Sequence, residues 1–233
     1  MKTCVLIQTC DKYENLWEGL YLSYHFNWCW DLEFPIYVLT EEKKFISDER
    51  FQTLNFGYLG DPPYNFSGRL IAALEHLKDL GYDSIFYTQD DFWPLFKTDS
   101  SIFRETYNLF KSEGMECIHV NEYLPWYSYS LSKTGNYIRG KEIHKFNPGS
   151  MYYYNHQSAF WKIDSLLRIQ NPGERADHNE DRGTERAWEI NPEYYFLSYD
   201  WYKAEFVAYK GELLNPALIC VRDWKFRFEW EKN

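Results

Sequence analysis

The fold class follows from one stretch of the sequence, Ser84-Ile85-Phe86-Tyr87-Thr88-Gln89-Asp90-Asp91. Its apolar first part has the length and the aromatic and β-branched content of a buried strand. In open α/β sheets, ligands bind at the carboxyl ends of the strands, which is where Asp90 and Asp91 stand. The same pair also suits a turn or a helix cap, and this stretch alone leaves both interpretations open.

The elements around this stretch alternate between strand and helix. In chain order we expect a strand at 5–7, a helix at 14–26, a strand at 35–40, a helix that Ser67 caps and that ends at Gly81, the strand at 84–88, a helix at 101–113 and a strand at 117–120. Alternation of this kind is typical of a mostly parallel sheet with helices on both faces.

The second half has a different pattern. Residues 123–160 are rich in tyrosine, and alternating stretches at 137–146 and 151–161 predict antiparallel strands beside the parallel part. We expect helices at 164–169 and 180–189 and strands at 194–199 and 205–209. Because no repeat or low-complexity linker divides the chain, we expect one continuous α/β domain over residues 1–233, with halves of about 1–120 and 121–233.

The charge balance limits the partners of the chain. With 35 acidic and 25 basic residues its formal net charge is −10. Non-specific binding to nucleic acid relies on a basic surface, so we expect no nucleic-acid partner. A single nucleotide is compatible with this charge, because its diphosphate needs only a metal ion and one or two local cations.

Aromatic residues are unusually frequent, at 21% of the chain. Their rings stack on sugars and nucleobases, and they also build cores. The composition leaves these two uses open.

The five cysteines, at 4, 10, 29, 117 and 220, are odd in number and show no CxxC spacing. Free thiols in a reducing compartment fit this pattern. The first residues lack the long apolar region of a signal peptide, and no run of 18 apolar residues exists that would span a membrane. We therefore expect a cytoplasmic protein without a membrane span.

Several catalytic motifs are excluded. Gly135-x4-Gly140-Lys141 approaches a phosphate-binding P-loop, but Glu142 stands where Ser or Thr would ligate magnesium. The chain has no G-x-S-x-G, no H-E-x-x-H and no G-x-G-x-x-G after a strand, and its six histidines are scattered. Hydrolase triads, dehydrogenases and zinc cages therefore have no motif in their favour.

Short runs in a fixed order carry a family resemblance. They are Gln8–Tyr13, Leu16-Trp17, Pro35–Tyr37, Gly68–Leu70, Tyr87–Phe92, His156–Lys162, Asn171–Glu174 and Glu180-x-x-Gly183-x-x-Arg186. Over residues 4–190 the chain resembles small GT-A glycosyltransferases of bacterial surface-polysaccharide loci and of large DNA viruses that glycosylate their own capsid proteins. The resemblance implies a GT-A (Rossmann-like) α/β fold with a smaller antiparallel part on the acceptor side.

The resemblance also implies a donor site. Thr9, Asp11 and Tyr13 would line the base, uracil or another, and its ribose. Arg69, at the start of its helix, would bind a phosphate or the donor sugar, with a surface ion pair as the alternative. Lys210 is a candidate cation for the diphosphate, or an ordinary exposed lysine.

The stretch quoted first takes the place of the family's DXD motif. The resemblance makes Asp91 the ligand of Mn²⁺ or Mg²⁺ and has Asp90 contact ribose or donor sugar. Gln89 departs from the motif, because a carboxylate is usual at its first position.

In the second half, Glu180 takes the place of the family's general base, with Asp181 as a close rival. A helix start, where acidic residues complement the dipole, is the alternative for both. Gln157 and Trp161 would shape the sugar and acceptor pocket.

These roles imply a hexosyltransferase. We expect it to move a hexose or deoxyhexose from a nucleoside-diphosphate sugar, with UDP favoured, to a glycan or glycoprotein. Because a carboxylate base is available, we expect inversion of configuration at the anomeric carbon. We expect the enzyme to act in polysaccharide biosynthesis in the cytoplasm, which for a viral chain is the cytoplasm of the host. The alternatives are a non-catalytic carbohydrate-binding protein that uses the aromatic residues and a glycoside hydrolase with two paired carboxylates.

Overall fold

The computed structural model describes residues 2–46, 48–61, 63–120, 130–197, 204–209 and 212–231. The strands are β1 Thr3–Gln8, β2 Ile36–Thr40, β3 Phe51–Asn55, β4 Ser84–Gln89, β5 Phe92–Pro94, β6 Cys117–His119, β7 Leu131–Ile138, β8 Lys141–Phe146, β9 Ala159–Lys162, β10 Tyr194–Leu197, β11 Ala204–Phe206, β12 Ala208–Tyr209 and β13 Glu212–Leu213. The helices are α1 Glu14–Asn27, α2 Phe66–Asp79, α3 Ser100–Ser112, α4 Ile163–Arg168, α5 Ala176–Ile190 and α6 Asn215–Glu231, with 3₁₀ turns η1 Asp11–Tyr13 and η2 Trp30–Leu32.

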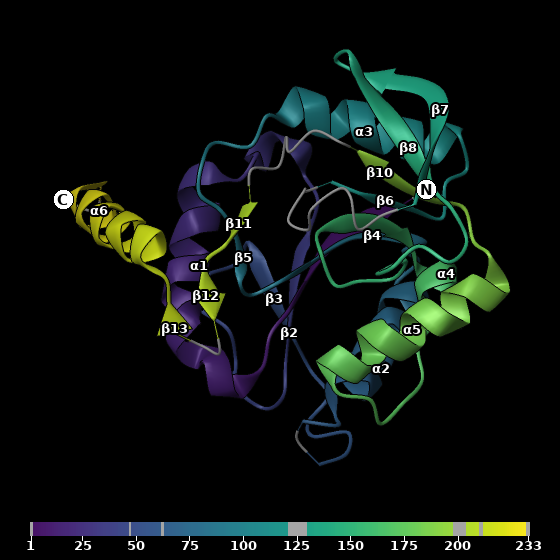
Figure 1. Ribbon diagram of the computed structural model, residues 1–233. Helices are drawn as coiled ribbons and strands as arrows, with labels where there is room; N and C mark the ends of the chain where they lie inside the picture. The colour runs from purple at the N-terminus through teal and green to yellow at the C-terminus, as the bar shows by residue number, and fades with distance from the viewer. Residues whose placement is uncertain are drawn as a thin grey trace.

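One sheet organises these elements (Figure 1). It has nine strands in the order β3-β2-β1-β4-β9-β6-β10-β8-β7. The first four are parallel neighbours, β9 lies antiparallel between β4 and β6, and the β7–β8 hairpin forms one edge. The expected fold class is confirmed: a mixed α/β fold with a parallel region flanked by helices and a smaller antiparallel part.

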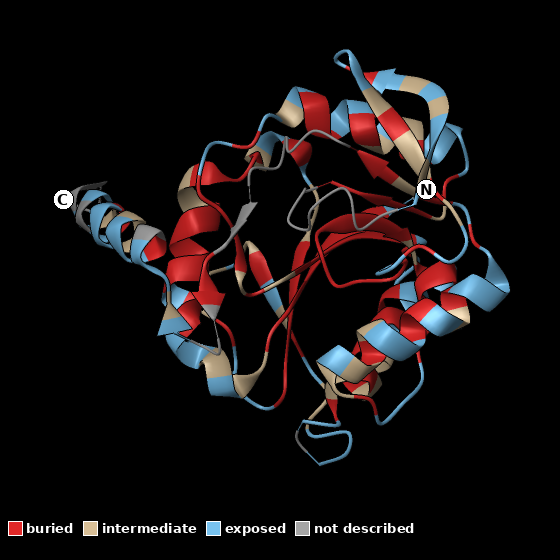
Figure 2. Ribbon diagram, in the orientation of Figure 1, coloured by how far each residue is buried: buried red, intermediate tan, exposed pale blue. Residues whose placement is uncertain are grey.

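Alternate residues of β1 pack against helices on opposite faces of the sheet. Val5 and Ile7 belong to a core cluster with buried residues of α1 and α3, whereas Cys4 and Leu6 belong to a second cluster with residues of α2, α4 and α5. Both faces of the central strands are therefore buried, and helices such as α1 and α5 turn their buried sides toward the sheet (Figure 2), whereas α6 packs against α1. A sheet covered on both faces leaves its edges and strand ends as the places for a ligand.

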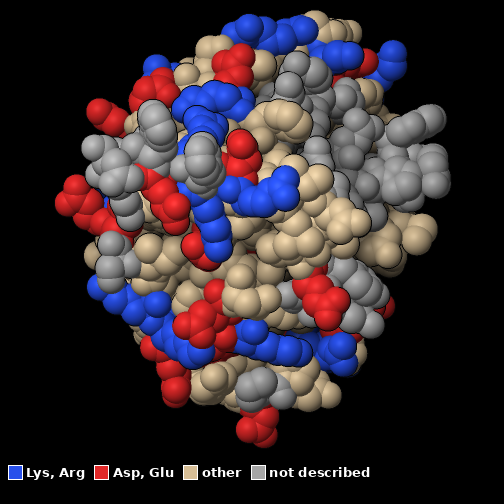
Figure 3. Space-filling view, turned by 90° about the vertical axis from the view of Figure 1, so that its left-hand side faces the viewer, with Lys and Arg blue, Asp and Glu red and all other residues tan. Residues whose placement is uncertain are grey.

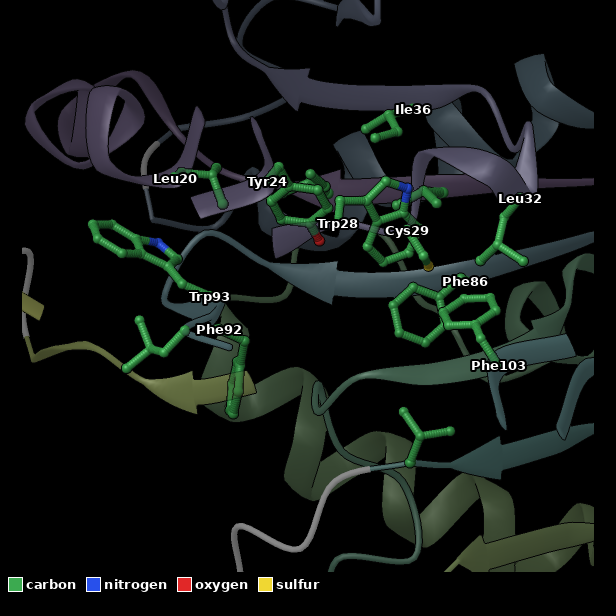
Figure 4. Packing of buried hydrophobic residues seen from close by; sticks show 14 of the residues in the cluster. Leu20, Tyr24, Trp28, Cys29, Leu32, Ile36, Phe86, Phe92, Trp93 and Phe103 are labelled. Carbon is green, nitrogen blue, oxygen red and sulfur yellow. The ribbon is translucent and has the colours of Figure 1, made fainter. Parts of the chain in front are cut away.

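Most of the large aromatic residues are core residues. Trp28, the residue after α1, packs edge-on against Phe103 of α3 at 5.3 Å and lies 6.1 Å from Phe86 of β4 (Figure 4). All three are 1% exposed or less. Each such side chain contributes about 1.5–3 kcal/mol through burial. The aromatic composition therefore reflects mainly the core, with a few rings left at the pocket described below.

Strand β5, which follows the Asp90-Asp91 turn, packs closely against α1. Trp93 of β5 lies against Gly19, so closely that a Cβ at that position would lie 2.1 Å from Trp93 Cη2. The indole is fully buried and its Nε1 donates to Asp90 O at 2.6 Å. Glycine at position 19 thus permits the contact that anchors the turn after β4.

Some expected elements are different in the structure. Ser67 is not a cap, because α2 begins at Phe66 and Ser67 Oγ accepts instead from Glu174 N at 2.9 Å. Of the stretch expected at 151–161, only Ala159–Lys162 is a strand, and it lies inside the sheet rather than beside it. Helix α5 begins at Ala176, well before residue 180.

Other features agree with the sequence. The near P-loop lies in the β7–β8 hairpin, with Gly140 at φ +78°, and is therefore no phosphate loop. All five cysteines are free, as expected. Within the described residues, no helix has the length and apolar character needed to cross a membrane. On the side of α1 and α6, basic and acidic side chains lie interspersed (Figure 3).

Candidate functional site

The carboxyl ends of β1 and β4 lie side by side, with Gln8 paired to Gln89. This register brings Thr9 next to Asp90, and Thr9 Oγ1 donates a hydrogen bond to Asp90 Oδ2. Trp17 Nε1 donates to the same Thr9 hydroxyl at 2.8 Å. Three residues from separate parts of the sequence thus meet at the edge that the strand pattern indicates.

The turn that carries the two aspartates is held on both sides. Asp90 N donates to Gln8 O at 3.1 Å, and the Trp93 indole holds Asp90 O. Val207 N donates to Asp91 O at 2.8 Å, beside the pairing of β5 with β11. The backbone of the turn is therefore fixed before any ligand arrives.

Electrostatically, the site is a concentration of acidic groups. Burial raises the pKa of Asp91 well above its usual range, and the neighbouring charges of Asp90 and then Glu180 raise it further. Asp91 Oδ1 is buried and has no hydrogen-bond partner among the described residues. Burial likewise raises the pKa of Asp90, against the opposing effects of the Thr9 hydrogen bond and the Arg69 charge. A cation beside these oxygens would favour their ionised forms.

Glu180 lies on α5, and its charge is one of the influences that raise the pKa of Asp91. Its Oε1 accepts from His156 N at 2.8 Å, and burial is the main cause that raises the pKa of Glu180. Because α5 begins at Ala176, Glu180 lies beyond the helix start, so the helix-start interpretation does not hold for it. Asp181 is exposed and is not among the main influences on Asp91.

A cavity of about 280 Å³ lies near the turn: Asp90 and Asp91 are not in its lining, but Arg69, which is, donates through NH1 to Thr9 O. It is lined by Cys10, Lys12, Tyr13, Glu41, Tyr58, Pro63, Asn65, Phe66, Arg69 and Ala176. The lining thus comes from the end of β1, the residue after β2, the loop before α2 and the first residues of α2 and α5. It combines aromatic rings with charged groups, as sites for polar organic ligands do.

Arg69 lies deep beneath this cavity. Its NH2 is 3.0 Å from Glu41 Oε1, its NH1 donates to Thr9 O at 2.8 Å, and the residue is 2% exposed. The alternative of a surface ion pair is therefore wrong, because the pair is buried. Arg69 Nε has no partner among the described residues, which leaves one donor for a ligand.

Asp11 acts on the cavity through its neighbours. Its two carboxylate oxygens accept from the N–H groups of Glu41, Glu42 and Lys43 at 3.1–3.2 Å, while Asp11 N donates to Glu41 Oε2. These bonds fix the loop after β2 and with it the Glu41 carboxylate. Sequence reasoning missed Glu41, although the first acidic residue after a strand was the signal that it used elsewhere.

The remaining residues that the sequence analysis proposed for the site are not among the described residues that line the cavity. Gln89 is half-buried at the end of β4. Gln157 is buried ahead of β9 and its Oε1 has no partner among the described residues. Trp161 does not shape a pocket: it is a fully buried core residue whose ring packs edge-on against Tyr194 at 4.9 Å. Lys210 lies outside the described residues.

The donor set suits a metal ion that a ligand helps to hold. Within the described part of the chain, no group of three or more His, Cys, Asp or Glu side chains could hold an ion. Mg²⁺ in phosphate-binding sites is typically held by one or two carboxylates, with phosphate and water as the other ligands. The unpartnered Asp91 Oδ1 beside Asp90 fits that arrangement.

The chain matches no protein-family model and no curated sequence. Among solved structures, residues 1–349 of S. aureus TarS match with a TM-score of 0.52 at 12% identity, covering 85% of this chain and 58% of that one. The complex of the same TarS fragment with UDP gives 0.52 at 14% identity, covering 85% and 58%. The complex with UDP-GlcNAc gives 0.50 at 13%, covering 85% and 56%.

This chain therefore spans less than two thirds of each of these TarS chains. Identities this low concern architecture rather than activity. The chain has an α/β fold like that of S. aureus TarS.

Proposed function

We propose that this chain is a glycosyltransferase that transfers a hexose or deoxyhexose from a UDP sugar to a glycan or glycoprotein, with inversion. The observation that carries the proposal is the acidic turn Asp90-Asp91, which Thr9 joins to Arg69 in the wall of a partly aromatic cavity and on which the charge of Glu180 acts. The fold supports it, because matching TarS structures are complexes with UDP and UDP-GlcNAc. Residues 1–120 would hold the donor, and residues 121–233 would face the acceptor.

The cavity suits the nucleoside part of the donor. Tyr13, Tyr58 and Phe66 offer ring surfaces against which a base can pack, and Glu41 and Asn65 offer polar partners. Glu41 is held in place by Asp11 and Arg69, so its carboxylate is preorganised.

The diphosphate would lie between the cavity and Asp91. Helices α2 and α5 both begin at the cavity, and neither has a side-chain hydrogen bond at its N-cap, unlike α3, which Asp99 caps. First-turn N–H groups without a side-chain cap favour an anion. In α2, Ser67 N already donates to Glu174 O, so the diphosphate would use other N–H groups of the two first turns. Arg69 Nε adds a buried donor, and Lys12 lines the same cavity.

We propose Asp91 as a ligand of Mn²⁺ or Mg²⁺. Bound there, the ion would neutralise charge on the departing diphosphate. Asp90, which already accepts the Thr9 hydroxyl, would orient the ribose or the donor sugar. The two carboxylates thereby take different roles although they are adjacent in the sequence.

Glu180 would act as the general base. Burial raises the pKa of its carboxyl group, which strengthens it as a proton acceptor. Glu180 takes the proton of the acceptor hydroxyl as that oxygen bonds to the anomeric carbon and the bond to the diphosphate breaks. Asp181 is the weaker candidate because it is exposed. We place this reaction in the cytoplasm, in polysaccharide or glycoprotein synthesis.

A thermal-shift screen of nucleoside diphosphates and their sugars, with and without Mn²⁺, tests the proposal. A ligand at 100 times its Kd stabilises the native state by about 2.7 kcal/mol. We expect UDP and UDP sugars with Mn²⁺ to raise the Tm, and uncharged oligosaccharides alone to leave it unchanged. A Tm that responds to free glycan but to no nucleotide contradicts the proposal and indicates a carbohydrate-binding protein.

The electrostatic influence between Asp91 and Glu180 also suits a second candidate, a glycoside hydrolase. Such an enzyme uses two carboxyl groups that flank the scissile bond and needs no nucleotide. Release of sugar from an aryl glycoside in the presence of EDTA, together with no response to UDP, would favour the hydrolase.

A further inference from the structure

A closed ring of buried hydrogen bonds joins the donor side of the site to α5. It begins where α2 meets the residue before the α5 N-cap. Ser67 N donates to Glu174 O at 3.1 Å, and Glu174 N donates to Ser67 Oγ at 2.9 Å. This reciprocal pair fastens the first turn of α2 to the segment that leads into α5.

The Glu174 side chain continues the ring into α5. Arg186 grips it with two parallel bonds, NH1 to Oε1 at 2.9 Å and NH2 to Oε2 at 2.7 Å. Asn179 Nδ2 donates to Glu174 Oε2 at 2.8 Å. Glu174 is 4% exposed and Asn179 is fully buried, so both act inside the protein rather than on a ligand.

Asn179 connects Glu174 to Tyr154, which lies in the segment before β9. Tyr154 OH donates to Asn179 Oδ1 at 3.0 Å, accepts from Gln170 Nε2 at 2.9 Å and lies 3.3 Å from His156 Nδ1. Helix α5 reaches this tyrosine only because residue 183 is glycine, since a Cβ there would lie 2.4 Å from Tyr154 Cδ1.

The ring then returns to its start. Tyr87 OH lies 3.3 Å from His156 Nδ1 and donates to Gln8 Oε1 at 2.8 Å. Gln8 Nε2 donates to Phe66 O at 3.3 Å, next to Ser67. Because Tyr154 OH and Tyr87 OH both donate to other groups, they would share the single Nδ1–H of His156. Through that shared contact the ring closes across β1, β4, the loop before β9, α5 and α2.

Glu180 is attached to this ring at two points. It follows Asn179 in the chain, and its Oε1 accepts from the backbone N–H of His156. The Asp90-Asp91 turn follows β4, which carries Tyr87. The ring therefore connects Glu180 with the Asp90-Asp91 turn, and a transfer reaction requires these two parts of the site to be held at a fixed distance.

We propose that Glu174 and Asn179 are positioning residues that hold Glu180 at its working place opposite Asp91. The inference rests on the proposed function and assigns a role to the Asn171–Glu174 run and to Arg186, which the donor site does not use. A misplacement on the order of 1 Å at a reacting group can cost about 100-fold in rate.

The charge arrangement of the ring provides the test. Asn179→Asp sets a carboxylate against Glu174 in place of the amide donor. Glu174→Gln removes the charge opposite Arg186. The double variant E174Q/N179D places an amide donor at 174 against an acceptor at 179, and Tyr154 OH can still donate to residue 179. It keeps the bond from Arg186 NH1 to the remaining oxygen of residue 174 but gives up the bond from Arg186 NH2, which shares Oε2 with Asn179 in the wild type. Glu185→Gln, an exposed change on the outer face of α5, is the matched control.

The measurements are the UDP Kd, the KM for the UDP sugar, and kcat per folded molecule for transfer or donor hydrolysis. We expect Asn179→Asp to lower kcat roughly 10- to 100-fold while the UDP Kd stays within about threefold, and the double variant to recover part of the loss. Glu185→Gln should match the wild type.

These measurements distinguish failure of the inference from failure of the proposed function. Unchanged kcat in Asn179→Asp, or no recovery in a folded double variant, overturns the inference while UDP binding by the wild type keeps the proposed function. If Asn179→Asp does not fold, the double variant alone decides, since it should fold and turn over. A wild-type protein that neither binds UDP nor cleaves a UDP sugar overturns the proposed function, and the inference with it.

Discussion

Gly19→Ala is the change that most directly links packing to the site. The new Cβ would lie 2.1 Å from Trp93 Cη2 and 2.6 Å from its Cζ3, closer than carbon atoms approach. The ring is fully buried, so it must move, and its movement breaks the Nε1 hydrogen bond to Asp90 O. The substitution therefore disturbs both the core and the turn of Asp90 and Asp91.

The expected magnitude combines three contributions. Overpacking costs about 1–3 kcal/mol, loss of one hydrogen bond costs about 1, and alanine gains about 1 over glycine in a helix. We expect a net loss of about 1–3 kcal/mol in the free energy of unfolding, and about 2–4 °C in Tm for each kcal/mol in a chain of this size.

Urea denaturation and a UDP titration measure the two effects of Gly19→Ala. Trp93→Phe supplies the control background, because phenylalanine lacks the distal ring atoms that the Cβ would meet. We expect Gly19→Ala to cost less in that background than in the wild type. A stabilised Gly19→Ala, or the same cost in both backgrounds, would refute the reasoning.

Three further predictions follow from buried charged and titratable groups. Arg69→Met leaves Glu41 buried without its partner, so it should lower the free energy of unfolding, measured by urea denaturation, by about 3–5 kcal/mol. The loss should be smaller when Glu41→Gln is present as well, and additive effects of the two substitutions would contradict the pairing. Burial lowers the pKa of His119 from 6.5 to about 3, so the unfolded chain binds its proton first and stability falls as pH drops from about 6.5 toward 3. At pH 5 this amounts to about 2 kcal/mol, and His119→Leu should remove that part of the pH dependence; an unchanged dependence refutes it. Glu180→Gln should lower transfer about 10²- to 10⁴-fold with UDP binding retained, and Asp181→Asn should stay near wild type; the reverse result moves the base to Asp181.

The sequence predicted the parts of the fold that depend on local pattern. The strand before Asp90 and the amphipathic helix after Ser67 carry clear periodicity, and both are present. The position of β9 is a different matter, because pairing between β4 and β6 is decided by residues far apart in the chain. β3 escaped notice because only two of its five residues, Phe51 and Leu54, are buried.

The candidate site divides in the same way. The rule that ligands bind at strand ends brought out Asp90 and Asp91, and the family resemblance brought out Thr9 and Asp11; all four follow the carboxyl ends of β1 and β4. The burial of the Arg69 ion pair depends on how α2 packs over β2, which no local pattern records. Trp161 was misjudged because an aromatic ring in a strand suits a core and a sugar pocket equally well.

Calorimetric titration of UDP with Mn²⁺ into the wild type and Asp91→Asn tests the central claim most directly. The account predicts that the wild type binds UDP more tightly with Mn²⁺ than with EDTA, and that Asp91→Asn loses this difference while its Tm without ligand is maintained. No UDP binding by the wild type, or the same gain from Mn²⁺ in Asp91→Asn, would contradict it.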